Sequence, residues 1–118
     1  KLSIRKAVKE MNPTKMVNGI APNFIHSLDA TLLAHTVLKL KEDGCTDFHL
    51  IHDSYGVPVT HVANLNKRVR EAYIELFKSN PLQQFVNQVR PDYEKTVDSV
   101  MINTLDLNQV SESAYIFS

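Results

Sequence analysis

The main candidate for chemistry is Asp53, a carboxylate that follows an apolar segment. It lies in residues 52–56 (HDSYG), at the end of a strand predicted over residues 46–52. A carboxylate at the point where a strand turns back projects from a rigid support, which suits metal binding or proton transfer. The same residues also suit an ordinary turn, because Asp and Ser side chains bond to nearby backbone groups. Considered alone, the segment favours the turn.

A zinc site is another interpretation of this region. His49, His52, Asp53 and His61 are of the types that bind zinc, as a His/Asp metallohydrolase would require. Alternation along a strand places His49 and Asp53 on one face and His52 on the other, which argues against one shared ion. The metallohydrolase is therefore kept only as an alternative.

Asp29 is the second carboxylate of interest. The 100-degree step of a helix places it beside Ile25 and Leu32, inside the apolar stripe of a helix predicted over residues 22–42. A carboxylate on a packed stripe is costly unless it is paired, so we expect the Asp29→Ala substitution to lower stability. An acid in the first turn of a helix is also favourable in itself. His26 leaves the stripe and faces either a partner or solvent.

The elements that must position these side chains indicate an α+β fold, mainly helical with a short β-hairpin. The hairpin is predicted from strands at residues 46–52 and 57–60, where Pro58 restricts the second strand to an edge. Apolar residues at three- and four-residue spacing predict helices over residues 22–42, closed by Gly44, and 62–77. Less regular patterns predict a short strand at 2–5, a loop at 11–19, helices at 82–89 and 93–101, and mostly loop from 103 onward.

Composition limits the class of protein. The 118 residues suffice for one domain with its own core, and the single cysteine excludes an intrachain disulfide. Apolar runs stay well short of the roughly 18 residues that cross a bilayer, so no membrane partner is expected. The net charge is zero, yet residues 1–41 carry seven basic and two acidic side chains, and residues 42–118 carry six and eleven. This asymmetry indicates either a basic part that faces a polyanion or a simply solvated start.

Two sequence blocks resemble the single-subunit, phage-type DNA-directed RNA polymerases, a family that includes the mitochondrial RNA polymerases. They are residues 18–29 (NGIAPNFIHSLD) and residues 51–56 (IHDSYG). The His-Asp pair is also similar to the third palm motif of family A DNA polymerases, in which Glu usually follows, and Ser54 favours the RNA polymerase branch. The resemblance covers nearly the whole chain, most securely residues 18–77.

This resemblance implies a C-terminal palm fragment over residues 1–118 that is inactive by itself. Residues 1–20 would form a basic strand and loop, 21–60 the long helix and catalytic hairpin, and 61–118 the helices and C-terminal tail. Asp53 would be the palm aspartate that binds Mg²⁺ during template-directed nucleotidyl transfer by two metal ions. The family's second aspartate and the fingers helix with its lysine and tyrosine have no match in this sequence.

The resemblance also implies contacts with nucleic acid. His26 would approach the minor-groove side of the base pair at the growing end, where acceptors are similar for every base pair. Lys1, Arg5 and Lys6 would lie near template phosphates.

Supporting roles follow for residues around Asp53. His52 and Ser54 flank the metal ligand and would tune or support it, and Asp29 belongs to the first block. Phe117 and Ser118 end a tail that would fold back toward the active site, although some relatives end in Ala.

The implied partners are the DNA template with its promoter, the RNA product, nucleoside triphosphates and the rest of the polymerase chain. Exposed interface would also favour self-association of the fragment. A phage enzyme would act in the host cytoplasm, and an organellar relative in the mitochondrial matrix. The rival from another class is a small, non-catalytic nucleic-acid-binding helical module that uses the basic first third of the chain.

Overall fold

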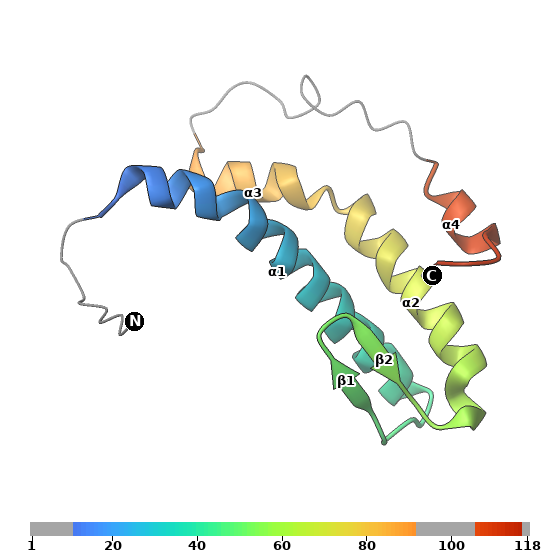
Figure 1. The fold of residues 1–118 in the computed structure, drawn as a ribbon. Helices are drawn as coiled ribbons and strands as arrows, with labels where there is room; N and C mark the ends of the chain where they lie inside the picture. The colour runs from blue at the N-terminus through green and yellow to red at the C-terminus, as the bar shows by residue number, and fades with distance from the viewer. Residues whose placement is uncertain (1–10, 92–105, 117–118) are drawn as a thin grey trace, which may run out of the picture.

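The computed structural model describes residues 11–91 and 106–116, so the predicted strand at 2–5 and helix at 93–101 lie outside the described residues. Within these residues the chain is mainly helical with one antiparallel hairpin, which confirms the predicted α+β class (Figure 1). The elements are α1 (Pro13–Glu42), β1 (His49–Ile51), β2 (Ser54–Gly56), the 3₁₀ helix η1 (Val59–His61), α2 (Val62–Lys78), α3 (Pro81–Val89) and α4 (Asn108–Glu112).

Helix α1 begins earlier than the sequence pattern predicts. The Lys15 N–H donates to the Asn12 side-chain oxygen at 3.0 Å, and Pro13 occupies the first turn, where its missing N–H costs nothing. The loop predicted at 11–19 is therefore wrong. Pro22 lies inside the helix instead of starting it. An internal proline removes a backbone hydrogen bond and favours a bend, and the first part of α1 runs in a different direction from the rest (Figure 1).

The core lies between α1 and α2, which run antiparallel. Leu32 of α1 packs with Ala72 and Leu76 of α2, and the partly buried Leu28 and Phe77 extend this cluster. Burying one such aliphatic side chain is worth roughly 1.5–3 kcal/mol. The amphipathic helix predicted over residues 62–77 is confirmed, and its apolar stripe fixes α2 against the second half of α1.

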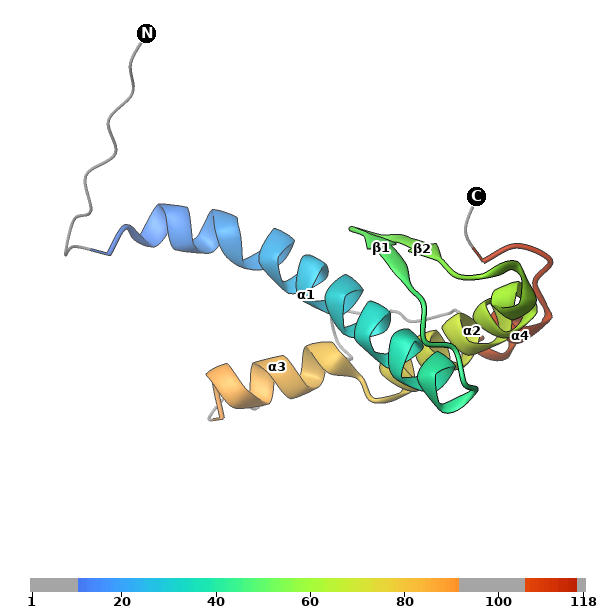
Figure 2. The same cartoon turned by 90° about the horizontal axis from the view of Figure 1, so that it is seen from below.

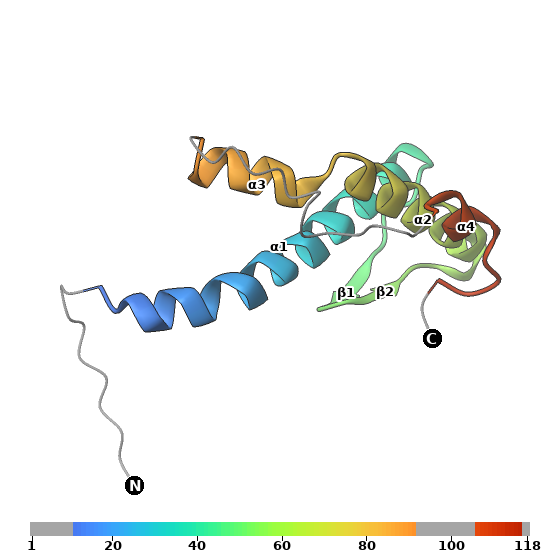
Figure 3. The same ribbon diagram turned by 90° about the horizontal axis from the view of Figure 1, so that it is seen from above.

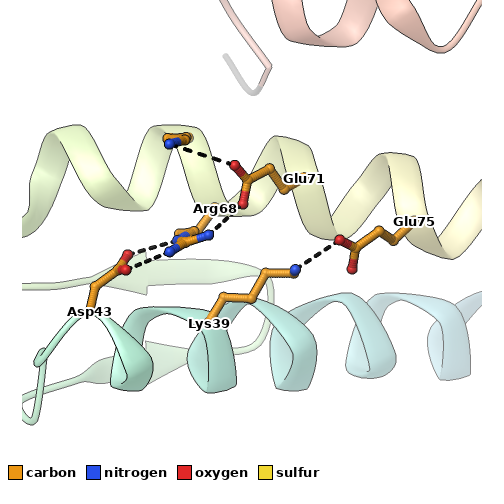
Figure 4. Close-up of polar contacts among 6 residues, drawn as sticks. Lys39, Asp43, Arg68, Glu71 and Glu75 are labelled. Atoms are coloured by element: carbon orange, nitrogen blue, oxygen red, sulfur yellow. Dashed lines mark hydrogen bonds and ion pairs between the residues drawn. The ribbon is translucent and has the colours of Figure 1, made fainter.

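Ion pairs also join the same two helices (Figure 4). The Arg68 guanidinium donates to both carboxylate oxygens of Asp43, at 2.7 and 2.5 Å, and to Glu71 at 2.8 Å. Lys39 lies four residues before Asp43, and its Nζ donates to Glu75 at 2.8 Å. The Asp43 and Lys39 contacts join the C-terminal end of α1 to α2, and therefore help to set the position of the hairpin between these helices.

Helix α3 lies beside the first half of α1. The rings of Phe24 in α1 and Phe85 in α3 lie with their centroids 5.0 Å apart, and Figure 2 shows α3 and the hairpin as separate bodies beside α1. Asn80, with a left-handed φ of 49°, ends α2 and caps α3 by accepting from the Gln83 N–H at 3.2 Å. A helix near residues 82–89 is thus confirmed. No helix in the described part of the chain is both long and apolar enough to cross a membrane.

Candidate functional site

Asp53 lies in the two-residue turn of the hairpin. Leu50 pairs with Tyr55 and Ile51 with Ser54, so His52 and Asp53 alone connect the strands. His52 has a φ of 54°, which is a left-handed conformation that few residues with a side chain adopt. Backbone strain of this kind is found most often at functional sites. The turn presents the exposed Asp53 side chain at the tip of a paired, two-stranded support.

The second strand differs from the prediction. Residues 57–60 do not form it, because Pro58 has no N–H to donate and leads directly into η1. The strand is Ser54–Gly56, which the sequence pattern assigned to the turn. Gly56 lies opposite His49, where an added Cβ would approach the His49 Cβ to 3.0 Å and its carbonyl oxygen to 3.1 Å. The close pairing at this end of the hairpin therefore depends on glycine.

The turn opens into a hollow of about 780 Å³. It is lined by Asp53 and its neighbours in the hairpin, Asp29 of α1, one face of α2 and residues 114–116. Two carboxylates that are 24 positions apart in the sequence thus face one concave space. Open hollows with a few convergent polar groups are the usual form of a binding site.

The position of Asp29 corrects the prediction made from the helical pattern. Its side chain is exposed, whereas the packed positions of α1 are Leu32, Thr36 and Leu40, spaced by four residues. Ile25, also predicted to be on the packed stripe, is 54% exposed. The contact between α1 and α2 is narrower than the apolar stripe, so Asp29 falls beside it, on the side of the hairpin.

Tyr55 lies near the two carboxylates and connects the hairpin with α1. Burial raises the pKa of its hydroxyl above the ordinary 10.0, a hydrogen bond with Thr36 acts in the opposite direction, and the charges of Asp29 and Asp53 raise it further. Tyr55 is consequently neutral at physiological pH. Its contact with Thr36 joins β2 to a buried position of α1.

The other predicted residues near the turn occupy different positions. Ser54 lines the hollow with Asp53. His52 is exposed at the turn, and His26 is exposed on α1, three residues before Asp29. The hydroxyl of Ser27 donates to the Phe24 carbonyl at 2.6 Å, so its donor is paired within the helix. Lys1, Arg5, Lys6, Phe117 and Ser118 lie outside the described residues, and their roles stay predictions.

The donor atoms of the site suit a hard cation more than zinc. Among residues 11–91 and 106–116, no group of three or more His, Cys, Asp and Glu side chains could hold a metal ion, so the predicted set of His49, His52, Asp53 and His61 is not assembled. Mg²⁺ needs fewer protein ligands, because it usually keeps several waters and takes one or two carboxylates plus substrate phosphates. Asp53 and Asp29 offer oxygen donors of the type that such an ion accepts.

The C-terminal segment contributes one wall of the hollow and contains a helix that the sequence pattern did not predict. The loop predicted from residue 103 onward contains α4, and residues 114–116 follow it into the hollow. Arg70 of α2 is buried against this segment and donates to the Val110 carbonyl at 3.0 Å. Its acceptors in this segment are backbone carbonyls some 40 positions away, which leave no local pattern that could have revealed the contact.

Similarity to known proteins decides the family of this chain. The family model described as DNA-dependent RNA polymerase matches residues 1–110, which include both sequence blocks and the hairpin. The chain belongs to this family. T7 RNA polymerase of Escherichia phage T7 is 35% identical over 116 residues, which are 92% of this chain and 13% of the phage protein.

Two further relatives show that this polymerase segment is of the phage and mitochondrial type. The DNA-directed RNA polymerase of Enterobacteria phage K11 is 34% identical over 92% of this chain and 13% of its own length. The mitochondrial DNA-directed RNA polymerase of Schizosaccharomyces pombe is 33% identical over 76% of this chain and 8% of its own length. The family predicted from residues 18–29 and 51–56 is confirmed. The segment spans 13% or less of each of these three relatives.

Proposed function

We propose that this segment supplies a metal-binding palm aspartate, Asp53, to the active site of a DNA-directed RNA polymerase. The observation that carries the proposal is the position of Asp53, exposed in a strained two-residue turn and facing a hollow that it shares with Asp29. Paired strands hold the turn, so the backbone that carries the carboxylate has a fixed position. Family membership supplies the reaction, which is template-directed nucleotidyl transfer.

In this proposal Asp53 would hold Mg²⁺ with its carboxylate. Two bound Mg²⁺ ions supply activation of the attacking 3′-hydroxyl and stabilisation of the leaving pyrophosphate. Asp29 adds a second negative charge to the hollow, which favours a cation there. Tyr55 stays neutral near both carboxylates and links the hairpin to α1 through its hydrogen bond with Thr36. The remaining ligands and the groups that bind the nucleoside triphosphate come from other parts of the polymerase.

Contacts with nucleic acid form the second half of the proposal. His26 is exposed on α1, close in sequence to Asp29, where it can approach the base pair at the growing end. Lys1, Arg5 and Lys6 belong to the basic part of the chain and would pair with template phosphates. The partners are accordingly the DNA template and promoter, the RNA product and nucleoside triphosphates. Replacing one of these lysines should reduce the salt dependence of DNA affinity by roughly one counterion.

The Asp53→Asn substitution in a complete polymerase that carries this segment tests the catalytic role. Removing supporting groups around a metal already costs about 10- to 100-fold, so loss of the ligand should lower nucleotide incorporation by at least about a hundredfold. Promoter binding should change little, because the substitution removes a metal ligand and leaves the DNA contacts in place.

Asp47→Asn is the matched control for this experiment. Asp47 is exposed, precedes β1 and does not line the hollow. Its carboxylate accepts a hydrogen bond from the Thr46 hydroxyl at 3.3 Å. The same change of charge at this position should leave incorporation unaltered. Incorporation by Asp53→Asn within tenfold of the parent would contradict the proposal and favour the non-catalytic nucleic-acid-binding module.

A further inference from the structure

Arg70 is a buried cation whose partners are neutral. Its side chain lies on α2 and the residue is only 7% exposed. In the described part of the chain, Nε donates to the Asn66 side-chain oxygen at 2.9 Å, and Nη1 donates to the Val110 carbonyl at 3.0 Å. Burial of a charged group is unfavourable unless hydrogen bonds compensate it. The guanidinium is therefore held here by a dense set of acceptors.

The remaining acceptors of Arg70 all lie in residues 111–114, at the end of α4 and just after it. Nη1 also contacts the carbonyls of Ser111, at 3.5 Å, and Ser113, and Nη2 contacts the carbonyl of Ala114 at 3.5 Å. The last carbonyls of a helix have no partner within the helix, so a cation at the end of the short α4 satisfies groups that would otherwise be unpaired. Figure 3 shows α4 lying against α2.

The same stretch of α2 also borders the hollow that contains Asp53. Asn66, which orients the guanidinium, and Val69, which precedes Arg70, both line the hollow. Ala114 is an acceptor of Arg70 and begins the stretch 114–116 that forms the opposite wall. Arg70 is thus the contact through which α2 fixes the position of this wall.

We propose that Arg70 is a positioning residue that holds the C-terminal segment in place as a wall of the hollow facing Asp53. A guanidinium suits this task because its planar set of N–H donors reaches several carbonyls at once, whereas a lysine ammonium acts from a single point. The structural half of the inference stands on the hydrogen bonds alone. The catalytic half rests on the proposed function of Asp53.

Hydrogen exchange in the 118-residue chain tests the structural half. Arg70→Gln should make the amides of residues 107–116 exchange at least about tenfold faster, because several charge-assisted hydrogen bonds are lost, and should leave the Ala72 amide in the core unchanged. Arg68→Gln is the matched control, since Arg68 lies on the same helix but pairs with Asp43 and Glu71. It should leave exchange at 107–116 unchanged.

Arg70→Lys should give an intermediate rate and replaces Arg70→Gln if that variant does not fold. Unchanged exchange at 107–116 in the Arg70 variant would overturn the inference.

A double-mutant cycle in the complete polymerase tests the catalytic half. Arg70→Gln should lower nucleotide incorporation by roughly ten- to a hundredfold, as expected when a group near the reacting atoms is misplaced. In a polymerase without residues 106–118, the same substitution should cause no further loss, because its effect passes through the deleted segment. Losses that multiply independently would overturn the positioning role. The exchange result does not depend on catalysis, so it stands even if Asp53→Asn proves active and the proposed function fails.

Discussion

Arg68 and Asp43 form a bidentate ion pair that joins α2 to the end of α1, with nitrogen–oxygen distances of 2.7 and 2.5 Å (Figure 4). The hydrogen bond from Arg68 is the largest cause that lowers the pKa of Asp43 below its ordinary 3.8, and the smaller effect of burial opposes it. The same contacts raise the pKa of Arg68. Both groups are thus charged together over a wide range of pH.

This pair predicts how the stability of the chain depends on acid. Because the pKa of Asp43 is lower in the folded than in the unfolded state, the pair adds stability above pH 3.8 that is lost as the pH falls through the folded-state pKa. Asp43→Asn should therefore weaken the dependence of the unfolding midpoint on pH below about pH 5. Urea unfolding at a series of pH values measures it, with Asp47→Asn as control. Equal pH slopes for Asp43→Asn and the parent would contradict this prediction.

Asp29→Ala should leave the stability of the chain nearly unchanged. Its side chain is exposed and lines the same hollow as Asp53, so removal costs no packing. We expect a change within about 0.5 kcal/mol, as for most surface substitutions. Leu32→Ala, one turn further along α1 and buried, should instead cost about 2–5 kcal/mol. Denaturant unfolding distinguishes the two, and a large loss for Asp29→Ala would show that this residue is packed after all.

Gly56→Ala should disturb the catalytic turn more than the fold as a whole. The added Cβ would lie 3.0 Å from the His49 Cβ and 3.1 Å from its carbonyl oxygen, so His49 must shift by a few tenths of an ångström at that pair. Incorporation by the complete polymerase should fall by about tenfold or more, since the turn carrying Asp53 moves.

Gly19→Ala provides the contrast for this experiment. Gly19 lies within α1, where an added Cβ meets only the Asn23 side chain at an ordinary 3.7 Å. Alanine should stabilise the helix there by roughly 0.5–1 kcal/mol without affecting incorporation. An active Gly56→Ala polymerase would indicate that the pairing of His49 with Gly56 does not position Asp53.

Much of the helical architecture can be predicted from the sequence, because the three- and four-residue spacing of apolar side chains on a helix is visible in the local sequence. The stripe over residues 62–77 corresponds to α2, and Gly44 follows the end of α1 as expected. The start of α1 was missed because Pro13 and Pro22 both suit a first helical turn, and only the Asn12 cap distinguishes them. Asp29 was misplaced because an apolar stripe does not show how wide the helix contact is.

The details of the site depend on pairing that a local pattern does not encode. The hairpin was predicted with the wrong second strand. Tyr55, predicted to lie in the turn, is a strand residue that pairs with Leu50. The family blocks nevertheless identified Asp53 and Asp29, which the fold brings to one hollow. The contact of Arg70 with the C-terminal segment gave no signal, since the acceptors there are backbone carbonyls of α4 and of the residues after it.

The most direct test of the account asks whether the side chain at position 53 contacts the metal. In a complete polymerase carrying Asp53→Cys, single-nucleotide addition is measured with Mg²⁺ and then with Mn²⁺, which accepts a thiolate ligand more readily. We expect a loss of at least about a hundredfold with Mg²⁺ and a recovery of about tenfold or more with Mn²⁺. Asp47→Cys should keep the parent's ratio of the two rates. An Asp53→Cys enzyme that matches the parent with Mg²⁺, or that shows the parent's metal ratio, would contradict the assignment of Asp53 as a metal ligand.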